Sequence, residues 1–493
     1  MPKKHVPILT YLFPRIQDAV FVGTLIAISI QGTFLLNGDG DLGRHITIGN
    51  YIINHREIPT RDIFSHTMTG QHLVPHEWLA QLILGVLHAV WGLTGVVWMI
   101  AVLIAGTFTL TYREMLRRNV FRTLALFIAL LAASASSLHW LARPHIFTFL
   151  FSAVWAYQLE NRNSKLWLFP LLMLVWANTH GAFVVGFLIW GAHMAGWLWE
   201  YLHGQSTTDT GSRLIIIGAS SLAVTLVNPA GWQLWGTSIG YVGNRFLIDQ
   251  TLEYQAPNFH NWSTWPFLIM LAVGILMNGF GGRLRPHEAL LFAGWTVLSL
   301  YSARNIPLFA IITAPFMGSA VQSALGRSIF LQGVEQRLAR IEGRMRGVFW
   351  PVASIVLLTI ATCIRPDPAN RFNPDRFPVA AVDWLSVHPQ EGRMFNNFIW
   401  GGYILYRMWP EQRVFIDGQT DFYGETLTLE YIKVTTLAEG WETVLAEHQV
   451  SWLLVQPDKP VVKALQEEMG WLVMYRDDTA VILRAPSIKD GEQ

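Results

Sequence analysis

The chain has 493 residues, of which 52% are hydrophobic and only 14% are charged, and its mean hydropathy is +0.32. A soluble protein of this length usually has about a quarter charged residues, so the composition favours a membrane protein. The net charge of +1 argues against nucleic-acid binding, and a single cysteine, Cys363, excludes an intramolecular disulfide or a thiolate metal site.

Apolar runs recur from residue 19 onward, and most are long enough to cross the roughly 30 Å hydrocarbon layer as helices. The first run is interpreted as an uncleaved helix rather than a signal peptide, because many more runs follow. We predict about eleven spans, at 19–36, 94–111, 123–138, 145–159, 166–177, 182–199, 214–227, 264–279, 289–303, 306–323 and 347–363. The chain is therefore predicted to be mainly α, a polytopic helical membrane protein.

The distribution of cations tests this topology, because cytoplasmic loops carry an excess of Lys and Arg. If the N-terminus (Lys3, Lys4, Arg15) is cytoplasmic, the turns after even-numbered spans should be basic, and they are. The outer loops hold only six arginines, which are Arg44, Arg56, Arg61, Arg143, Arg245 and Arg304. An odd number of spans places the C-terminal region outside the cytoplasm.

Three segments complete the predicted organisation. Within the transmembrane domain (1–364), residues 326–346 repeat apolar groups at helical spacing with arginines opposite, which is typical of an interfacial helix on the cytoplasmic leaflet. A proline-rich linker covers 365–378. Residues 379–493 form a small extracytoplasmic α/β domain, with predicted strands at 413–416, 452–455, 471–475 and 480–483 and helices near 379–387, 424–436, 440–448 and 459–468.

The first outer loop, 37–93, is longer than a turn requires. It opens with GDGDLGRH, and two apolar helices are predicted in it, at 41–55 and 77–90. Asp41 and His45 share a helix face, so Asp39, Asp41 and His45 could hold Mg²⁺ or Mn²⁺, or one carboxylate could be a general base. Alternatively, one aspartate caps the helix N-terminus. Glu77 either caps the second helix or joins the same site.

Further polar residues stand where predicted spans meet the outer surface. A lone arginine there usually reaches phosphate headgroups of the membrane lipids. Several such residues opening toward one leaflet could instead line a pocket for an anionic lipid phosphate. They are His76, Arg143, His145, Asn178, His180, Arg304 and Asn305. In the C-terminal domain, Asp417 and Asp421 follow a predicted strand, where they either hold a ligand or form an Asp-Gly turn.

One helix, a long outer loop opening with Asp-x-Asp, many spans and an outer C-terminal domain together resemble the GT-C class of glycosyltransferases. The stretches GDGDLGRHITIGNYIINHREIPTRDIFSHT and FNNFIWGGYILYRMWPEQRVFIDGQTDFYG also resemble a group of bacterial multi-span membrane proteins. These resemblances imply an enzyme of the bacterial plasma membrane that uses a polyprenyl-phosphate-linked sugar and a glycan, lipid or protein acceptor. Asp39 or Asp41 would be the base or metal ligand, and Arg143 and Arg304 would hold the donor phosphate.

Sugar transfer requires a group that accepts the acceptor's proton, and a single base suffices for an inverting displacement. We therefore predict Asp41, Asp39 and Glu77 as catalytic, with His45, His76, Arg143, His145, Asn178, His180, Arg304 and Asn305 binding substrate. The alternative is a non-enzymatic lipid-linked glycan transporter or polysaccharide-assembly protein. Transporters usually carry mid-membrane charges and repeat symmetry, which we do not find in this sequence.

Overall fold

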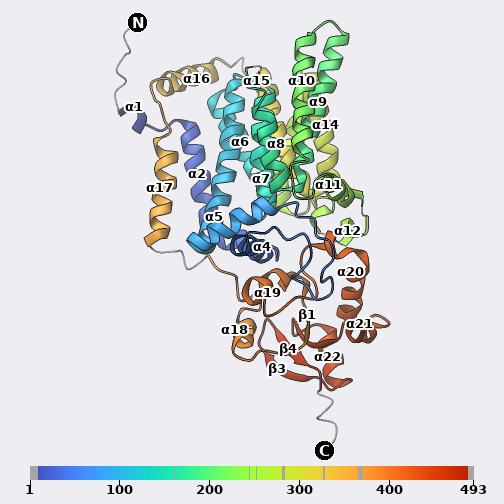
Figure 1. Cartoon of the computed structure of the whole chain (residues 1–493). Helices are drawn as coiled ribbons and strands as arrows, with labels where there is room; N and C mark the ends of the chain where they lie inside the picture. The colour runs from blue at the N-terminus through green and yellow to red at the C-terminus, as the bar shows by residue number, and fades with distance from the viewer. Residues whose placement is uncertain are drawn as a thin grey trace, which may run out of the picture.

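The apolar runs form a bundle of helices, and a smaller domain with a sheet lies at one end of it (Figure 1). This computed structural model describes residues 9–161, 163–243, 245–250, 252–279, 284–325, 328–364 and 370–486. Lys3, Lys4, residues 326–327 of the predicted interfacial helix and residues 365–369 of the predicted linker lie outside the described residues.

A helix stands at each of the eleven predicted spans. They are α2 (Ile16–Ile30) with α3 (Gly32–Asn37), α5 (Trp78–Arg117), α6 (Arg122–Ser136), α7 (His145–Leu159), α8 (Leu168–Thr179), α9 (Val184–Leu202), α10 (Thr208–Val224), α13 (Trp265–Gly279), α14 (Pro286–Tyr301), α15 (Ile306–Leu325) and α17 (Phe349–Ile364). Within the described residues, four helical segments are long and apolar enough to cross a membrane: Trp78–Arg117, Arg122–His139, Gly181–Leu202 and Ala303–Leu325.

Two helices differ from their predicted bounds. The first predicted span is broken at Gln31, which separates α2 from α3. In contrast, the second apolar helix of the outer loop and the second span form one 40-residue helix, α5. The two parts meet at Gly92, whose φ of 61° lies in the left-handed region that glycine adopts without strain. The predicted loop between them is therefore a kink.

Helix α4 (Leu42–His55) forms from the acidic motif as predicted and lies between the bundle and the C-terminal domain (Figure 1). Its apolar residues, among them Ile46 and Ile52, are buried. It packs against α5 and against α19 (Gly401–Met408) of the C-terminal domain. Close packing on α5 depends on Gly49, because a Cβ there would collide with the carbonyl oxygen of Gln81.

The C-terminal domain contains a four-stranded sheet with the order β1-β2-β4-β3. Strand β1 (Arg393–Asn396) pairs in parallel with β2 (Val450–Val455), whereas β4 (Val481–Arg484) is antiparallel to both β2 and β3 (Leu472–Arg476). The helices around it are α18 (Val379–Val387), α19, α20 (Thr420–Thr436), α21 (Trp441–Glu447) and α22 (Pro460–Glu467).

The strand predicted at 413–416 is wrong, and β1 was not predicted. Val414 instead forms an isolated parallel bridge with Ser65 of the first outer loop. The side chain of Asn396 takes the place of a strand partner, because it donates to the carbonyl of Ile416 (2.9 Å) and accepts from the backbone N–H of Phe415 (2.8 Å). The outer loop and the C-terminal domain therefore share backbone contacts.

Glycines bring the acidic motif and the C-terminal domain into direct backbone contact. A Cβ on Gly40 would collide with the carbonyl oxygen of Ile399, and one on Gly43 would collide with that of Gly402. Gly402 has the reciprocal restriction, since its Cβ would collide with the carbonyl of Gly40. The glycines of GDGDLG therefore form a docking surface for the C-terminal domain.

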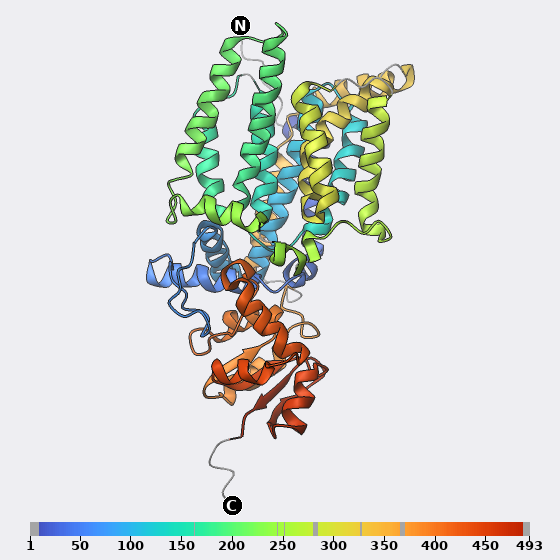
Figure 2. The ribbon, with the colours of Figure 1, turned by 90° about the vertical axis from the view of Figure 1, so that its right-hand side faces the viewer.

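Short helices lie at both ends of the bundle. Helix α16 (Ile329–Glu342) crosses the end opposite the C-terminal domain (Figure 1), where Glu335 and Glu342 pair with Arg122. Helices α11 (Gln233–Gly243) and α12 (Arg245–Gln250) lie at the boundary with the C-terminal domain (Figure 2), and α12 contacts α20. The remaining helical segments are α1 (Leu9–Leu12) and the 3-10 turns η1 (Ser137–His139), η2 (Gly181–Phe183), η3 (Leu252–Tyr254), η4 (Trp262–Thr264), η5 (Ala303–Asn305) and η6 (Phe398–Trp400).

Candidate active site

The two aspartates of the acidic motif converge on one guanidinium. Arg143, in the turn between η1 and α7, places Nη2 2.7 Å from Oδ2 of Asp41 and Nη1 3.2 Å from Oδ2 of Asp39. Oδ1 of Asp39 accepts the backbone N–H of Asp41 at 3.0 Å. Asp41 occupies the N-cap position of α4, but its side chain accepts no capping hydrogen bond. Its carboxylate is thus held by Arg143 rather than by the helix terminus.

A third carboxylate connects Arg143 with Arg304. Glu253, in η3, lies 3.6 Å from Nη1 of Arg143 and 3.0 Å from Nη1 of Arg304. Arg304 also donates to the hydroxyl of Tyr254 and lies over its ring, 4.9 Å from the centroid. Nε2 of His139 is 3.4 Å from Glu253. Asp39, Asp41, Arg143 and Arg304, predicted separately, are thereby joined in one cluster.

Neither Glu253 nor His139 was predicted as a site residue. Their positions carry no special signal, because a carboxylate in an outer loop and a histidine at a span end are ordinary near lipid headgroups. Only the folded chain brings the loop after α12 next to the turn before α7.

Glu77 joins the site rather than capping its helix. It stands at the N-cap of α5 without a side-chain capping bond, and three imidazoles surround its carboxylate. Nε2 of His180 lies 3.6 Å away, Nδ1 of His45 3.9 Å away and Nε2 of His76 4.0 Å away. His180 is fixed on its other side by the Thr148 hydroxyl, 2.9 Å from Nδ1. Three of the four predicted histidines therefore gather around Glu77.

The remaining predicted residues lie at the edge of the charged cluster or outside it. Nε2 of His145 lies 2.8 Å from the backbone carbonyl oxygen of His139, and the two rings also meet edge to face. Asn178 accepts from the indole N–H of Trp78 at 2.7 Å and borders the groove described below. Asn305 donates to the carbonyl of Leu298 at 3.0 Å and thus binds the end of α14 rather than the charged cluster.

The pKa values of the carboxyl groups in the cluster are shifted in different directions. Burial, reinforced by the charge of Asp41, raises the pKa of Asp39 to about 6, although Arg143 opposes the shift. Burial also raises the pKa of Glu77. For Glu253, the two arginines outweigh burial and lower the pKa to about 2. Asp39 therefore has a pKa near neutral pH, whereas Glu253 is a permanent counter-ion.

The histidines of the cluster are held neutral. Burial, with Arg143 and Arg44 nearby, lowers the pKa of His45 well below its usual value, and burial, with Arg304 nearby, does the same to the pKa of His180. Neutral imidazoles can donate or accept hydrogen bonds but do not compensate carboxylate charge. The fixed positive charges of the cluster are therefore its arginines.

A guanidinium contacts both aspartates: Arg143 pairs with Oδ2 of Asp39 and with Oδ2 of Asp41. Binding of Mg²⁺ or Mn²⁺ by Asp39, Asp41 and His45 stays a prediction. His45 is directed toward Glu77 instead of Asp41. Among the residues that the structure describes, the group with metal-ligand spacing is Glu160, His193 and His287, elsewhere in the bundle.

An apolar groove of about 610 Å³ opens beside Glu77. It lies between the start of α5, the end of α8 and the end of α10, and Trp78, which directly follows Glu77, forms part of its wall. Its lining residues are Trp78, Leu79, Leu174, Val175, Asn178, Leu226, Val227, Asn228 and Pro229. An extended hydrocarbon chain could lie there with a polar end close to His180 and Glu77.

The C-terminal domain covers the acidic motif from the other side. A Cβ on Gly418 would collide with Oδ1 of Asp41, so only glycine fits against the carboxylate. The neighbouring Asp417 pairs with Arg44 at 3.2 Å, and both side chains are buried. Asp417 also accepts from the Gln419 backbone N–H at 2.9 Å, which is the predicted Asp-Gly turn. The turn thus both shapes the loop and fixes the domain on α4.

The chain shares its fold with solved structures of GT-C glycosyltransferases, which is the class that the sequence resembles. No family model and no curated protein matches the chain by sequence. Among solved structures, the Archaeoglobus fulgidus oligosaccharyltransferase tethered to an acceptor peptide matches with a TM-score of 0.59 and 13% identity, over 90% of this chain and 69% of that one.

Two further structures share the fold. The A. fulgidus oligosaccharyltransferase AglB with an inhibitory peptide and a dolichol-phosphate matches with a TM-score of 0.54 and 13% identity, over 89% of this chain and 69% of that one. ArnT from Cupriavidus metallidurans bound to undecaprenyl phosphate matches with a TM-score of 0.50 and 14% identity, over 96% of this chain and 99% of that one. At these identities the similarity establishes the fold.

Proposed function

We propose that this chain is a glycosyltransferase that moves a sugar from a polyprenyl-phosphate donor to a glycan, lipid or protein acceptor on the outer face of a bacterial plasma membrane. The observation that carries the proposal is the convergence of Asp39, Asp41, Arg143, Glu253 and Arg304. An apolar groove whose wall includes Trp78, directly after Glu77, adds to it. The eleven helices would be membrane spans, with the N-terminus cytoplasmic and the C-terminal domain outside. The shared fold of AglB and ArnT supports the donor class.

In the proposed reaction, the acceptor oxygen attacks the anomeric carbon as the bond from that carbon to the phosphate oxygen breaks. Asp39 accepts the acceptor's proton, since a base works best when its pKa lies near the working pH, and the pKa of Asp39 is raised to about 6. The polyprenyl phosphate leaves with the bonding electrons. A direct displacement of this kind inverts the anomeric centre.

The arginines would stabilise the leaving phosphate. Asp41 keeps Arg143 in place through the 2.7 Å ion pair, and Arg304 is bound by Glu253 and Tyr254. Because Glu253 occupies both arginines, the donor phosphate would replace it on Arg304. The histidines around Glu77 would orient the sugar hydroxyls, and the groove at Trp78 would hold the polyprenyl chain.

Release of free undecaprenyl phosphate tests the proposal. Purified protein in lipid nanodiscs would be given a panel of undecaprenyl-phosphate-linked sugars with glycan, lipid and peptide acceptors. We expect Asp39→Asn and Asp41→Asn each to abolish release without loss of helical circular dichroism. Asp375→Asn, at an exposed carboxylate, is the matched control and should release lipid phosphate normally.

Two results would contradict the proposal. Unchanged release in both aspartate variants would remove the acidic motif from the mechanism. Saturable donor binding by the wild-type protein without any release would instead support a non-enzymatic role in lipid-linked glycan transport or polysaccharide assembly.

A further inference from the structure

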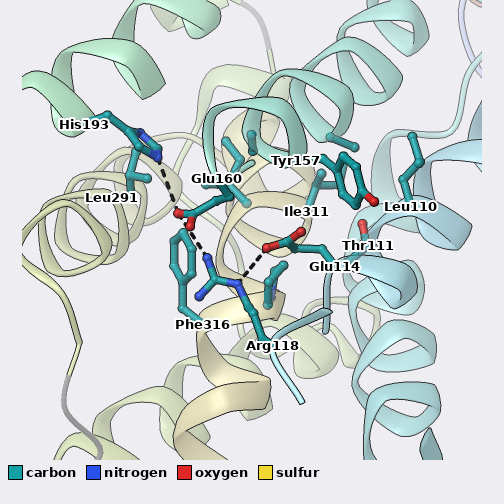
Figure 3. Close-up of a pocket in the computed structure, with 14 residues that line it drawn as sticks. Leu110, Thr111, Glu114, Arg118, Tyr157, Glu160, His193, Leu291, Ile311 and Phe316 are labelled. Atoms are coloured by element: carbon teal, nitrogen blue, oxygen red, sulfur yellow. Dashed lines mark hydrogen bonds and ion pairs between the residues drawn. The ribbon is translucent and has the colours of Figure 1, made fainter. Parts of the chain in front are cut away.

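A second polar cluster lies at the other end of the bundle, where the C-terminal end of α7 meets α9 and α14. Glu160, His193 and His287 come from three separate segments, and their ligand atoms all lie within 4.8 Å of one another. Oε1 of Glu160 is 3.0 Å from Nε2 of His287 and 3.4 Å from Nε2 of His193. Figure 3 shows His193 directed at Glu160. The proposed sugar transfer makes no use of this cluster.

The hydrogen bonding of His193 leaves one ring nitrogen without a partner. Nδ1 lies 2.9 Å from the carbonyl oxygen of Ile189, an arrangement in which Nδ1 must carry the proton. In the neutral ring, Nε2 then presents a lone pair. That atom is buried without a hydrogen-bond partner, and the whole side chain is 9% exposed. A lone pair facing a carboxylate oxygen is repulsive, so either a proton or a metal ion must lie between the two atoms as a positive centre.

The geometry fits a metal ion as that centre. Metal-bound histidines typically donate their other ring N–H to a backbone carbonyl, as His193 does to Ile189. Ligands about 2.0–2.1 Å from a tetrahedral Zn²⁺ lie roughly 3.3 Å apart. The separations of 3.0 and 3.4 Å around Glu160 are close to that value. The rings of His193 and His287 stack with centroids 4.4 Å apart, and the Nε2 atoms of both lie near Oε1 of Glu160.

A small cavity supplies room for a further ligand. It has a volume of about 20 Å³, and its lining includes Glu114, Arg118, Glu160 and His193 (Figure 3). A volume of this size holds about one water molecule. Three protein ligands and one water complete a tetrahedral shell.

The charged side chains around Glu160, His193 and His287 determine how strongly these residues would bind a metal ion. Arg118 lies 3.1 Å from Glu160 and Arg285 lies 2.6 Å from it, so two guanidiniums hold the carboxylate but repel a dication. Both arginines also pair with Glu288, at 2.6 and 2.7 Å, which offsets part of that repulsion. Binding is therefore expected to be weaker than in a structural zinc site with only neutral and anionic neighbours. Imidazole ligands disfavour Mg²⁺.

We propose that Glu160, His193 and His287 form a divalent transition-metal site, with Zn²⁺ the preferred ion, that ties α7, α9 and α14 together at the end of the bundle opposite the sugar-transfer site. The site is structural, because its three ligands connect three separate segments of the chain. Metal binding would raise the stability of the native protein in proportion to its occupancy.

Metal content and thermal stability test the site directly. Protein purified with EDTA and dialysed against Zn²⁺ would be analysed by mass spectrometry of the bound metal. We expect about one Zn²⁺ per wild-type chain and at least a fivefold loss in His193→Gln and His287→Gln. Zn²⁺ should raise the thermal unfolding temperature of the wild type but not of either variant. Mg²⁺ should have no effect on any of them.

His203→Gln is the matched control. His203 lies at the end of the same helix and makes the same contact with the carbonyl four residues earlier, at 2.8 Å from Trp199, but it is exposed. This variant should keep its Zn²⁺. Equal zinc content in wild type and His193→Gln would overturn the proposal, as would pH-dependent stability without metal binding, which would indicate a protonated His193. If both variants fail to fold, Co²⁺ titration of the wild type decides, and the absence of a tetrahedral visible spectrum overturns the site.

Discussion

Removing one member of the Arg44–Asp417 pair should loosen the C-terminal domain from the acidic motif. The two atoms Arg44 Nε and Asp417 Oδ2 are 3.2 Å apart, and the side chains are 6% and 0% exposed. Asp417 has two other donors, the Gln419 N–H at 2.9 Å and the Tyr423 hydroxyl at 3.1 Å. Asp417→Asn retains a carbonyl oxygen for Gln419 but leaves the guanidinium of Arg44 buried without a counter-ion.

An uncompensated buried charge costs about 3–5 kcal/mol. Asp417→Asn and Arg44→Met should therefore each lower the free energy of unfolding by that amount. The double variant removes both charges, so its loss should be smaller than the sum of the two single losses by about 2 kcal/mol or more. Asp383→Asn is the control, because its pair with Arg407 is 2.7 Å long but lies at the surface, where such pairs contribute under about 1 kcal/mol.

Urea unfolding of the detergent-solubilised protein, followed by tryptophan fluorescence, measures these energies. The reasoning is refuted if either single variant at the Arg44–Asp417 pair loses less than about 1 kcal/mol, or if the two losses simply add in the double variant. Either result would mean that solvent reaches the pair and that glycine contacts alone hold the domain.

Three other expectations concern the candidate site and the domain contact. The rate of sugar transfer should rise with pH and reach half its maximum near pH 6, because Asp39, with its pKa raised to about 6, accepts a proton only above that value; a profile flat from pH 5 to 8 would exclude it as the base. Arg304→Met should raise the KM for the donor by about tenfold or more, because the donor phosphate loses one charge-assisted contact. The KM for the acceptor should stay constant. Gly43→Ala should lower the free energy of unfolding by about 1–3 kcal/mol through overpacking against backbone, whereas Gly333→Ala, on α16 with open space around it, should raise it by up to about 1 kcal/mol.

The long apolar runs were sufficient to predict the helices of the bundle. The predicted helix at 145–159 coincides with α7, and the predicted helix at 379–387 coincides with α18. Long apolar runs can form little other than helices, because every backbone polar group must find a partner inside its own segment in an apolar medium. Short strands carry less information, which is why 413–416 was mistaken for a sheet strand and β1 was missed.

The sequence predicted which polar residues lie on the outer face of the membrane, but it did not predict which of them contact one another. Asp39, Asp41, Arg143 and Arg304 were assigned to one face from the distribution of charges, and the structure joins them through ion pairs. Glu253, which connects the two arginines, could not be identified because spacing in the sequence does not encode contacts between distant loops. The same applies to His45: sharing a helix face with Asp41 did not fix its direction, since Glu77 and Gln81 of α5 attract its ring.

The contact between Thr67 and Phe415 joins residues 348 positions apart, and the Ser65–Val414 bridge lies beside it. At the usual 5–20 residues per second, a ribosome needs roughly 20–70 s to extend the chain over that distance. During this interval the acidic loop has already left the ribosome while the segment that covers it does not yet exist. The cover over the acidic motif is consequently completed only late in synthesis, so a translation product truncated before Val414 would lack these contacts.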